Sequence, residues 1–202
     1  MRLLVDTDAF CKLTSSGLFA AAADLLGGKA STVERLPALP HMLRRGKLRK
    51  TLGDQLADHL LPLAEMLPVV PEAPSEFAGL LVGKDGIDVG EVQLFALTAS
   101  DTLFLMSGDK RALRAIGREQ AIVTSLARKI VCLEAILLGL CMKLGREVVR
   151  TAVGSHARLD QVFTVCFSPG TTVPEDCLGS YLRELQAAVH PLVLWMPKGG
   201  AQ

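Results

Sequence analysis

Acidic side chains follow short apolar runs at widely separated places in this chain. Asp6 follows the apolar residues 3–5, Asp109 comes soon after the apolar residues 103–106, and Glu91 opens a helical pattern between them. If the two runs are parallel strands, their carboxyl ends meet at one sheet edge, where ligands collect in open α/β sheets. Carboxylates gathered there repel one another unless a hard cation such as Mg²⁺ or Mn²⁺ joins them. The spacing therefore favours a divalent-metal site at this edge of the sheet.

The same acids also have structural interpretations. Asp88 and Glu91 have the spacing of a capping box, in which each side chain accepts a backbone N–H of the other. Asp6 and Asp109 could each cap a helix, which contributes about 1 kcal/mol per cap. Helix capping alone does not explain why acids follow both apolar runs. We therefore expect Asp6, Glu91 and Asp109 to be catalytic metal ligands, with Asp8 and Asp88 as auxiliary acids.

Two groups of cations are candidates for nucleic-acid contacts. A basic run of five cations within seven residues could contact several phosphates, and a solvated helical surface is the equal alternative. No aromatic residue lies in the run, so base stacking is not predicted there. Two further cations directly follow Asp109 and could contact a phosphate near the metal. The candidates are Arg44, Arg45, Lys47, Arg49, Lys50, Lys110 and Arg111.

A competing enzyme class is suggested by the D-x-D pattern of Asp6 and Asp8. Phosphatases that form an aspartyl-phosphate use the first Asp as nucleophile and the second as acid. Such an enzyme needs a second acidic pair downstream, and after Asp109 the sequence continues with basic and apolar residues. We therefore retain this class only as a third alternative.

Apolar runs that alternate with helical patterns predict an α/β fold with a parallel sheet. Strands are expected at 3–5, within 30–40, at 67–71, at 103–106 and at 130–133. Helices are expected at 8–26, at 41–66 with a break near Gly46 or Gly53, at 134–153 and at 174–189.

The chain resembles the PIN domain family over roughly residues 1–140, on the strand-Asp-Thr start, the Asp-x-Gly-Glu helix and the strand that ends before Ser-Gly-Asp. The resemblance implies a three-layer fold with a mainly parallel central sheet flanked by helices. It also implies a Mg- or Mn-dependent nuclease, with Asp6, Glu91 and Asp109 as its acids. RNA is the expected substrate and DNA the alternative.

The chain departs from the family pattern at one acid. A carboxylate usually follows the second strand, and within residues 32–42 only Glu34 is acidic. Asp8 could replace it. The alternative function is a catalytically weakened PIN-like domain that binds nucleic acid or protein, and a protein partner or homodimer is compatible with either function.

Composition sets the remaining expectations. The 202 residues suit a PIN-like domain at 1–153 and a C-terminal extension at 154–202 packed on it. Net charge is +1, so no global field indicates nucleic acid. Five scattered cysteines disfavour a disulfide framework, and the apolar tract 130–142 is too short to span a membrane. A cytoplasmic protein with no membrane partner is expected.

Overall fold

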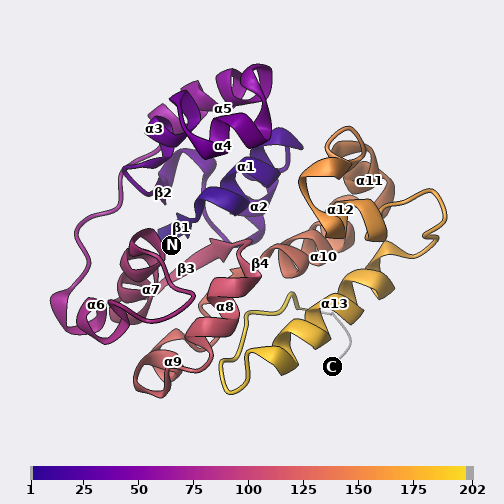
Figure 1. The fold of residues 1–202 in the computed structure, drawn as a ribbon. Coiled ribbons are helices and arrows are strands. Elements are labelled where there is room, and N and C mark those ends of the chain that lie inside the picture. The colour runs from indigo at the N-terminus through magenta and orange to yellow at the C-terminus, as the bar shows by residue number, and fades with distance from the viewer. Residues whose placement is uncertain (1, 199–202) are drawn as a thin grey trace.

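A four-stranded parallel sheet forms the centre of the molecule (Figure 1). The computed structural model describes residues 2–198. The strands lie in the order β2-β1-β3-β4 and comprise β1 (Arg2–Val5), β2 (Val33–Arg35), β3 (Leu103–Ser107) and β4 (Ile130–Cys132). This arrangement confirms the predicted α/β fold with a parallel sheet and is consistent with a three-layer PIN-like architecture.

The central strands are apolar because helices cover both of their faces. Leu4 pairs with Leu105 and Val5 with Met106, and all four side chains are buried. Parallel strands covered on both sides have continuous apolar runs rather than alternation. The register places the residues that follow β1 beside those that follow β3, and the Asp6 N–H donates to the Met106 carbonyl at 3.0 Å.

The first connection contains two helices where one was predicted. Helix α1 (Thr7–Ser15) ends before Gly17, whose φ of 68° suits glycine, and α2 (Phe19–Leu25) begins after it. The Ser16 hydroxyl donates to the Lys12 carbonyl at 2.8 Å and satisfies an acceptor at the helix end. A short 3-10 turn, η1 (Ala30–Thr32), leads into β2.

Three helices after β2 form a lobe at the top of Figure 1. They are α3 (Leu39–Arg44), α4 (Lys47–Leu52) and α5 (Asp54–Met66), and breaks occur at both Gly46 and Gly53, with φ of 98° and 83°. The strand predicted at 67–71 is reduced to a single parallel bridge between Val69 and Arg35. The prolines on both sides of this short segment cannot donate ladder hydrogen bonds, so no longer strand forms.

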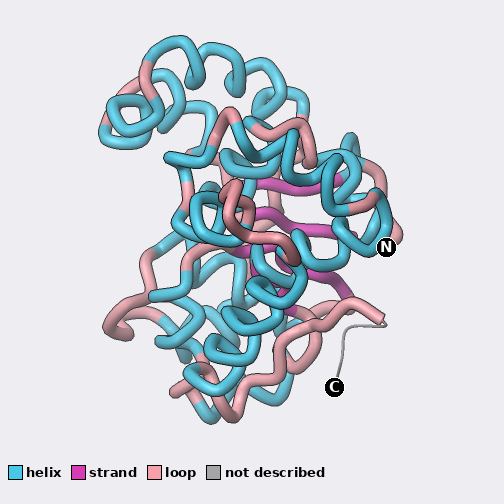
Figure 2. Tube along the Cα trace, turned by 90° about the vertical axis from the view of Figure 1, so that its right-hand side faces the viewer, coloured by secondary structure: helices cyan, strands magenta, loops and turns pink. Residues whose placement is uncertain are grey.

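Two groups of helices enclose the sheet (Figure 2). Helix α7 (Val89–Ser100) packs on β3, on α6 (Ser75–Leu81) and on α9 (Gln120–Leu126). Helix α8 (Lys110–Ile116) follows β3 in the chain. Helix α10 (Leu133–Leu144) packs on β4 and on α2. The helices predicted before and after the third strand of the sheet are thus present, and each begins at an acidic segment.

Residues 146–198 remain attached to this core. After Gly145 the chain forms α11 (Arg146–Gly154), the 3-10 turn η2 (Ala157–Leu159), α12 (Gln161–Cys166) and α13 (Pro174–Ala188), and α13 packs along α10. The segment beyond α13 runs beside β4. The Arg128 N–H donates to the Val193 carbonyl at 2.7 Å, and the Trp195 N–H donates to the Ile130 carbonyl at 2.9 Å.

Residues 133–141 of the apolar helix α10 are buried by protein neighbours. Within residues 2–198, no helix has both the length and the apolar character needed to cross a membrane.

The attachment of the C-terminal segment predicts a contrast between two neighbouring residues. Leu194 is 1% exposed and Val193 is 41% exposed. Leu194→Ala should lower the free energy of unfolding by about 2–4 kcal/mol because it leaves a cavity against the core. Val193→Ala should change it by less than about 0.5 kcal/mol. Urea unfolding of both variants measures the difference, and equal effects would show that this segment does not contribute to the core.

Candidate functional site

The Asp6 carboxylate joins the ends of the two central strands. Its Oδ1 accepts a hydrogen bond from the Ala9 N–H at 2.6 Å, which caps α1. Its Oδ2 accepts from the Ser107 hydroxyl at 2.6 Å and from the Gly108 N–H at 2.9 Å. Asp6 is buried, and three donors from two strand ends fix its orientation.

Asp8 lies in the first turn of α1 and takes part in a chain of charges. Lys12 Nζ lies 2.5 Å from Asp8 Oδ2 and 2.5 Å from Asp160 Oδ2. Lys12 is buried, and Asp160 also caps α12 by accepting the Val162 N–H at 2.6 Å. The C-terminal extension therefore supplies a carboxylate to the acidic edge of the sheet.

The turn between β3 and α8 lies directly against Asp8. A Cβ atom placed on Gly108 would be 2.1 Å from Asp8 Oδ2 and 3.3 Å from the Ala9 nitrogen. No residue with a side chain fits there without moving Asp8. Glycine therefore allows the ends of β1 and β3 to approach closely at this edge.

Asp109 caps α8, Glu91 belongs to the capping box of α7, and both acids lie near one cation. Asp109 Oδ1 accepts the Arg111 and Ala112 N–H groups at 2.8 and 3.1 Å. Glu91 Oε2 accepts the Asp88 N–H at 2.6 Å, and Asp88 Oδ1 accepts the Glu91 N–H at 2.9 Å. The guanidinium of Arg111 lies 3.8 Å from Glu91 Oε1 and 3.6 Å from Asp109 Oδ2. The predicted capping box is present, and Arg111 lies between the two acids.

Burial and neighbouring acids raise the pKa of the acids on α1. Burial raises the pKa of Asp6 to about 6, and Asp8 adds to the shift, while the hydrogen bonds from Ser107, Ala9 and Gly108 oppose it. Burial also raises the pKa of Asp8, Lys12 counteracts the rise, and Asp160 and Asp109 add to it. Burial alone would lower the pKa of Lys12, but the two carboxylates keep it above its usual value.

Glu91 has a raised pKa for a similar reason. Burial raises the pKa of Glu91 to about 7, and the charges of Asp88 and Asp109 contribute. The hydrogen bond from the Asp88 N–H and the charge of Arg111 act in the opposite direction. Asp109 thus affects both Asp8 and Glu91, so these carboxylates belong to one electrostatic group.

The types of donor in this group suit a hard divalent cation. Asp6, Asp8, Glu91 and Asp109 offer carboxylate oxygens, which Mg²⁺ and Mn²⁺ prefer. Within residues 2–198, however, no three His, Cys, Asp or Glu side chains are already arranged as a set of metal ligands. Mg²⁺ is usually held by one or two carboxylates together with waters and substrate phosphates, so the donors fit the ion without forming a closed cage.

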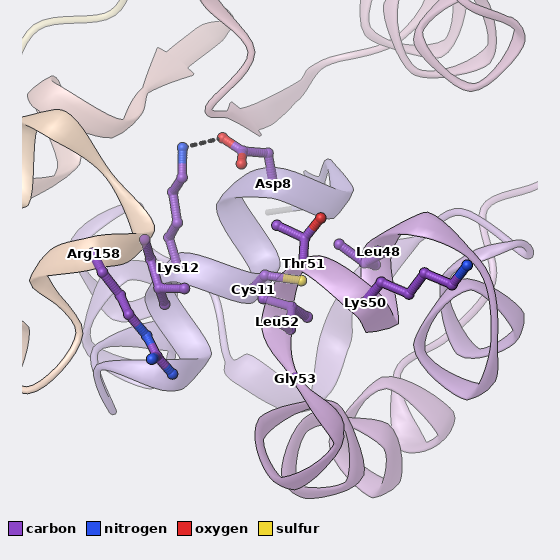
Figure 3. A pocket seen from close by; sticks show the side chains of 10 residues that line it. Asp8, Cys11, Lys12, Leu48, Lys50, Thr51, Leu52, Gly53 and Arg158 are labelled. Carbon is purple, nitrogen blue, oxygen red and sulfur yellow. Dashed lines mark hydrogen bonds and ion pairs between the residues drawn. The ribbon is translucent and has the colours of Figure 1, made fainter.

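A hollow of about 370 Å³ opens beside Asp8 (Figure 3). It connects α1, the end of α4 and the 3-10 turn η2, and three cations contribute to its walls. Figure 3 shows Lys12 directed to Asp8, with Lys50 and Arg158 on different sides of the hollow. The lining residues are Asp8, Cys11, Lys12, Leu48, Lys50, Thr51, Leu52, Gly53, Arg158 and Leu159.

Some predicted nucleic-acid contacts are occupied by ion pairs. Arg44 pairs with Glu65, and Arg49 pairs with both Asp54 and Asp58. The remaining cations of the run have no salt bridge within the described part of the chain, and they are Arg45, Lys47 and Lys50.

Lys110, which was expected to contact a phosphate near the metal, is instead paired with another acid. Its Nζ lies 2.6 Å from Oε1 of the buried Glu134 and 5.3 Å from the centre of the Tyr181 ring. Arg111, the other cation after Asp109, is the one that lies beside the acids.

Three residues of the site were not found from the sequence. Lys12 could have been recognised because it lies four residues after Asp8, the spacing of an ion pair on a helix. Asp160 carries the signal of a helix cap, but nothing in the sequence indicates its pairing with Lys12. Arg158 has no local signal and reaches the hollow only through the path of the C-terminal extension.

Comparisons with protein-family models, with curated proteins and with solved structures find no match to this chain.

The contact between Gly108 and Asp8 predicts that even a methyl group disturbs the site. Gly108→Ala should displace the Asp8 carboxylate from Lys12 and lower the free energy of unfolding by about 1–3 kcal/mol. Gly154→Ala is the control, because a Cβ there meets no atom within 4 Å. Chemical denaturation measures both variants. If Gly108→Ala is as stable as Gly154→Ala, the turn is not packed against Asp8 as described.

Proposed function

We propose that this protein is a divalent-metal-dependent nuclease that acts on RNA, with DNA as the alternative substrate. The observation that supports the proposal best is the acidic group at the carboxyl edge of the parallel sheet. Asp6 and Asp8 follow β1, Asp109 follows β3 and Glu91 comes from α7, and their charges influence one another.

A divalent cation would be held by Asp6, Asp8, Glu91 and Asp109, with Asp88 as a further acid that orients Glu91. When bound, the ion would neutralise the phosphodiester and make a water molecule more acidic for attack on phosphorus. A positive charge there would also favour the ionised forms of Asp6, Asp8 and Glu91, whose pKa values are raised by burial and by neighbouring acids.

The remaining residues of the site have roles in positioning. The three donors to Asp6 keep its carboxylate in one orientation. Lys12 holds Asp8 against Gly108, and Arg111 stands between Glu91 and Asp109. Arg111 is largely exposed and could bind a phosphate oxygen of the substrate next to the acids.

The cations around the hollow would bind the backbone of a nucleic acid on one side of the acidic group. Lys50 and Arg158 line the hollow, and Asp8 forms part of the same surface. Phosphate contacts of this type give affinity without base specificity. The chain would therefore cleave or bind nucleic acid with little dependence on sequence.

A second candidate is a PIN-like domain that binds nucleic acid or protein without cleavage. The observation that favours it is that the oxygens of Asp6, Asp88 and Asp109 already accept backbone hydrogen bonds as helix caps. An aspartyl-phosphate enzyme stays the third alternative, because no second acidic pair follows Asp109.

Substitution of the acids tests the first candidate. Asp6→Asn and Glu91→Gln should each reduce Mn²⁺-dependent cleavage of a mixed-sequence RNA by about 100-fold or more, because each removes a charge that the metal site requires. Glu184→Gln, an exposed acid on α13, is the control and should keep full activity. Circular dichroism checks that each variant is folded.

Metal binding separates the two candidates. Mn²⁺ should raise the thermal midpoint of the wild type, and EDTA should reverse the rise. The rise should be larger at pH 7.5 than at pH 5, because protons compete with the metal once Asp6 and Glu91 are protonated. Asp6→Asn should show a smaller rise. RNA binding without a Mn²⁺ effect and without cleavage would support the binding domain instead.

The hollow predicts which cations matter for affinity. Replacing Lys50 and Arg158 together by Ala should weaken binding of a fluorescently labelled RNA and lower the slope of log Kd against log salt by roughly 1–2. Arg183→Ala is the control, since this exposed cation on α13 does not line the hollow. Fluorescence anisotropy over a salt series gives both quantities, and an unchanged slope would place the nucleic acid elsewhere.

A further inference from the structure

Two cysteines of the C-terminal extension meet between neighbouring helices. Cys166 is the last residue of α12, and Cys177 lies in the first turn of α13. Both are free thiols, and their Sγ atoms lie 2.7 Å apart. A covalent disulfide needs a separation of about 2.05 Å, so a shift of less than about 1 Å would join them.

Side-chain hydrogen bonds hold the loop between the two cysteines. The Arg150 guanidinium donates to the carbonyls of Phe167, Ser168 and Thr171 at 3.2, 2.8 and 2.7 Å. The Ser168 and Thr171 hydroxyls also lie 2.9 Å apart. These contacts fix the path of the chain from α12 to α13, so the thiols are kept together by the backbone and do not meet by chance.

The pair combines one hidden and one accessible sulfur. Cys166 is 0% exposed, whereas Cys177 is partly exposed. The other cysteines, Cys11, Cys132 and Cys141, are buried, and none of them has a sulfur contact within the described residues. A small oxidant can therefore react with Cys177 first. Cys166 is the thiol placed to attack the mixed disulfide that this reaction forms.

We propose that Cys166 and Cys177 are a modification site at which a small-molecule disulfide oxidises them to an intramolecular disulfide. Cys177, as its thiolate, attacks one sulfur of the oxidant, whose S–S bond breaks and releases one thiol. The Cys166 sulfur then attacks the mixed disulfide, forms the bond to Cys177 and releases the second thiol. Two electrons pass to the oxidant, and the two protons lost by the cysteines end on the two released thiols.

The disulfide would fix the C-terminal end of α12, whereas Asp160 caps its N-terminal end. Asp160, which begins α12, forms the ion pair with Lys12 beside Asp8. A disulfide at Cys166 would thus hold both ends of this helix, one by a covalent bond and one by charge. Formation of the bond does not depend on nuclease activity.

Oxidised glutathione added to the full chain, followed by alkylation in denaturant and mass spectrometry, tests the proposal. Alkylated thiols should fall from five to three. The peptide of residues 159–183, which contains both cysteines and no internal Lys or Arg, should lose two hydrogens and carry no label. Cleavage after Glu175 should leave its two halves joined until dithiothreitol is added.

Thermal unfolding gives a second measurement. Oxidation should raise the midpoint by roughly 5 °C, because the crosslink restricts the unfolded chain, and dithiothreitol should reverse the rise. Cys177→Ser should keep its four thiols and show no rise. Cys141→Ala is the matched control and should fall from four thiols to two, with the same rise as the wild type. Five labelled thiols after oxidation, a stable glutathione adduct at Cys177, or a crosslink to another cysteine would overturn the proposal.

Discussion

The Asp6 carboxylate is the contact on which the arrangement of the sheet edge depends. It receives hydrogen bonds from the start of α1 and from the turn after β3, so one side chain connects two strands that lie about a hundred residues apart in the chain. A buried acid with several donors is stabilised as a charged group, yet burial and Asp8 raise its pKa. The Asp6 carboxylate is thus held in one orientation, while its negative charge is only partly compensated by its neighbours.

The other acids at the carboxyl edge of the sheet also have negative charges that are only partly compensated. Lys12 partly offsets the charge of Asp8, and Arg111 partly offsets the charge of Glu91, but the pKa values of both acids remain raised. Acids that serve only as caps are usually exposed and need no such balance. Capping and the gathering of charge are therefore both present here, and the same hydrogen bonds that start the helices also bring the carboxylates to one edge.

The sequence indicated the fold well because the fold depends on local patterns. The apolar runs before Asp6 and Asp109 are the two central strands, and the capping box at Asp88 starts α7, as expected from spacing alone. The prediction of a strand at 67–71 was wrong because a strand needs hydrogen bonds to a neighbouring strand. The prolines of this segment cannot donate them, and only one bridge forms. The direction of Lys110 and the ion pairs of Arg44 and Arg49 could not be predicted, since their partners lie on other elements. The pairing of Lys12 with Asp8 could be predicted from their four-residue spacing, whereas the pairing of Lys12 with Asp160 could not.

The position of Lys12 between two carboxylates has a consequence for the charge of the site. With Asp8 as its only neighbour, Lys12 would cancel that acid almost completely and leave little attraction for a cation. Asp160 takes a share of the same ammonium group, so the Asp8–Lys12–Asp160 group keeps a net negative charge. Asp160, which lies far along the chain at the start of the short helix α12, thereby helps to keep the edge of the sheet negatively charged.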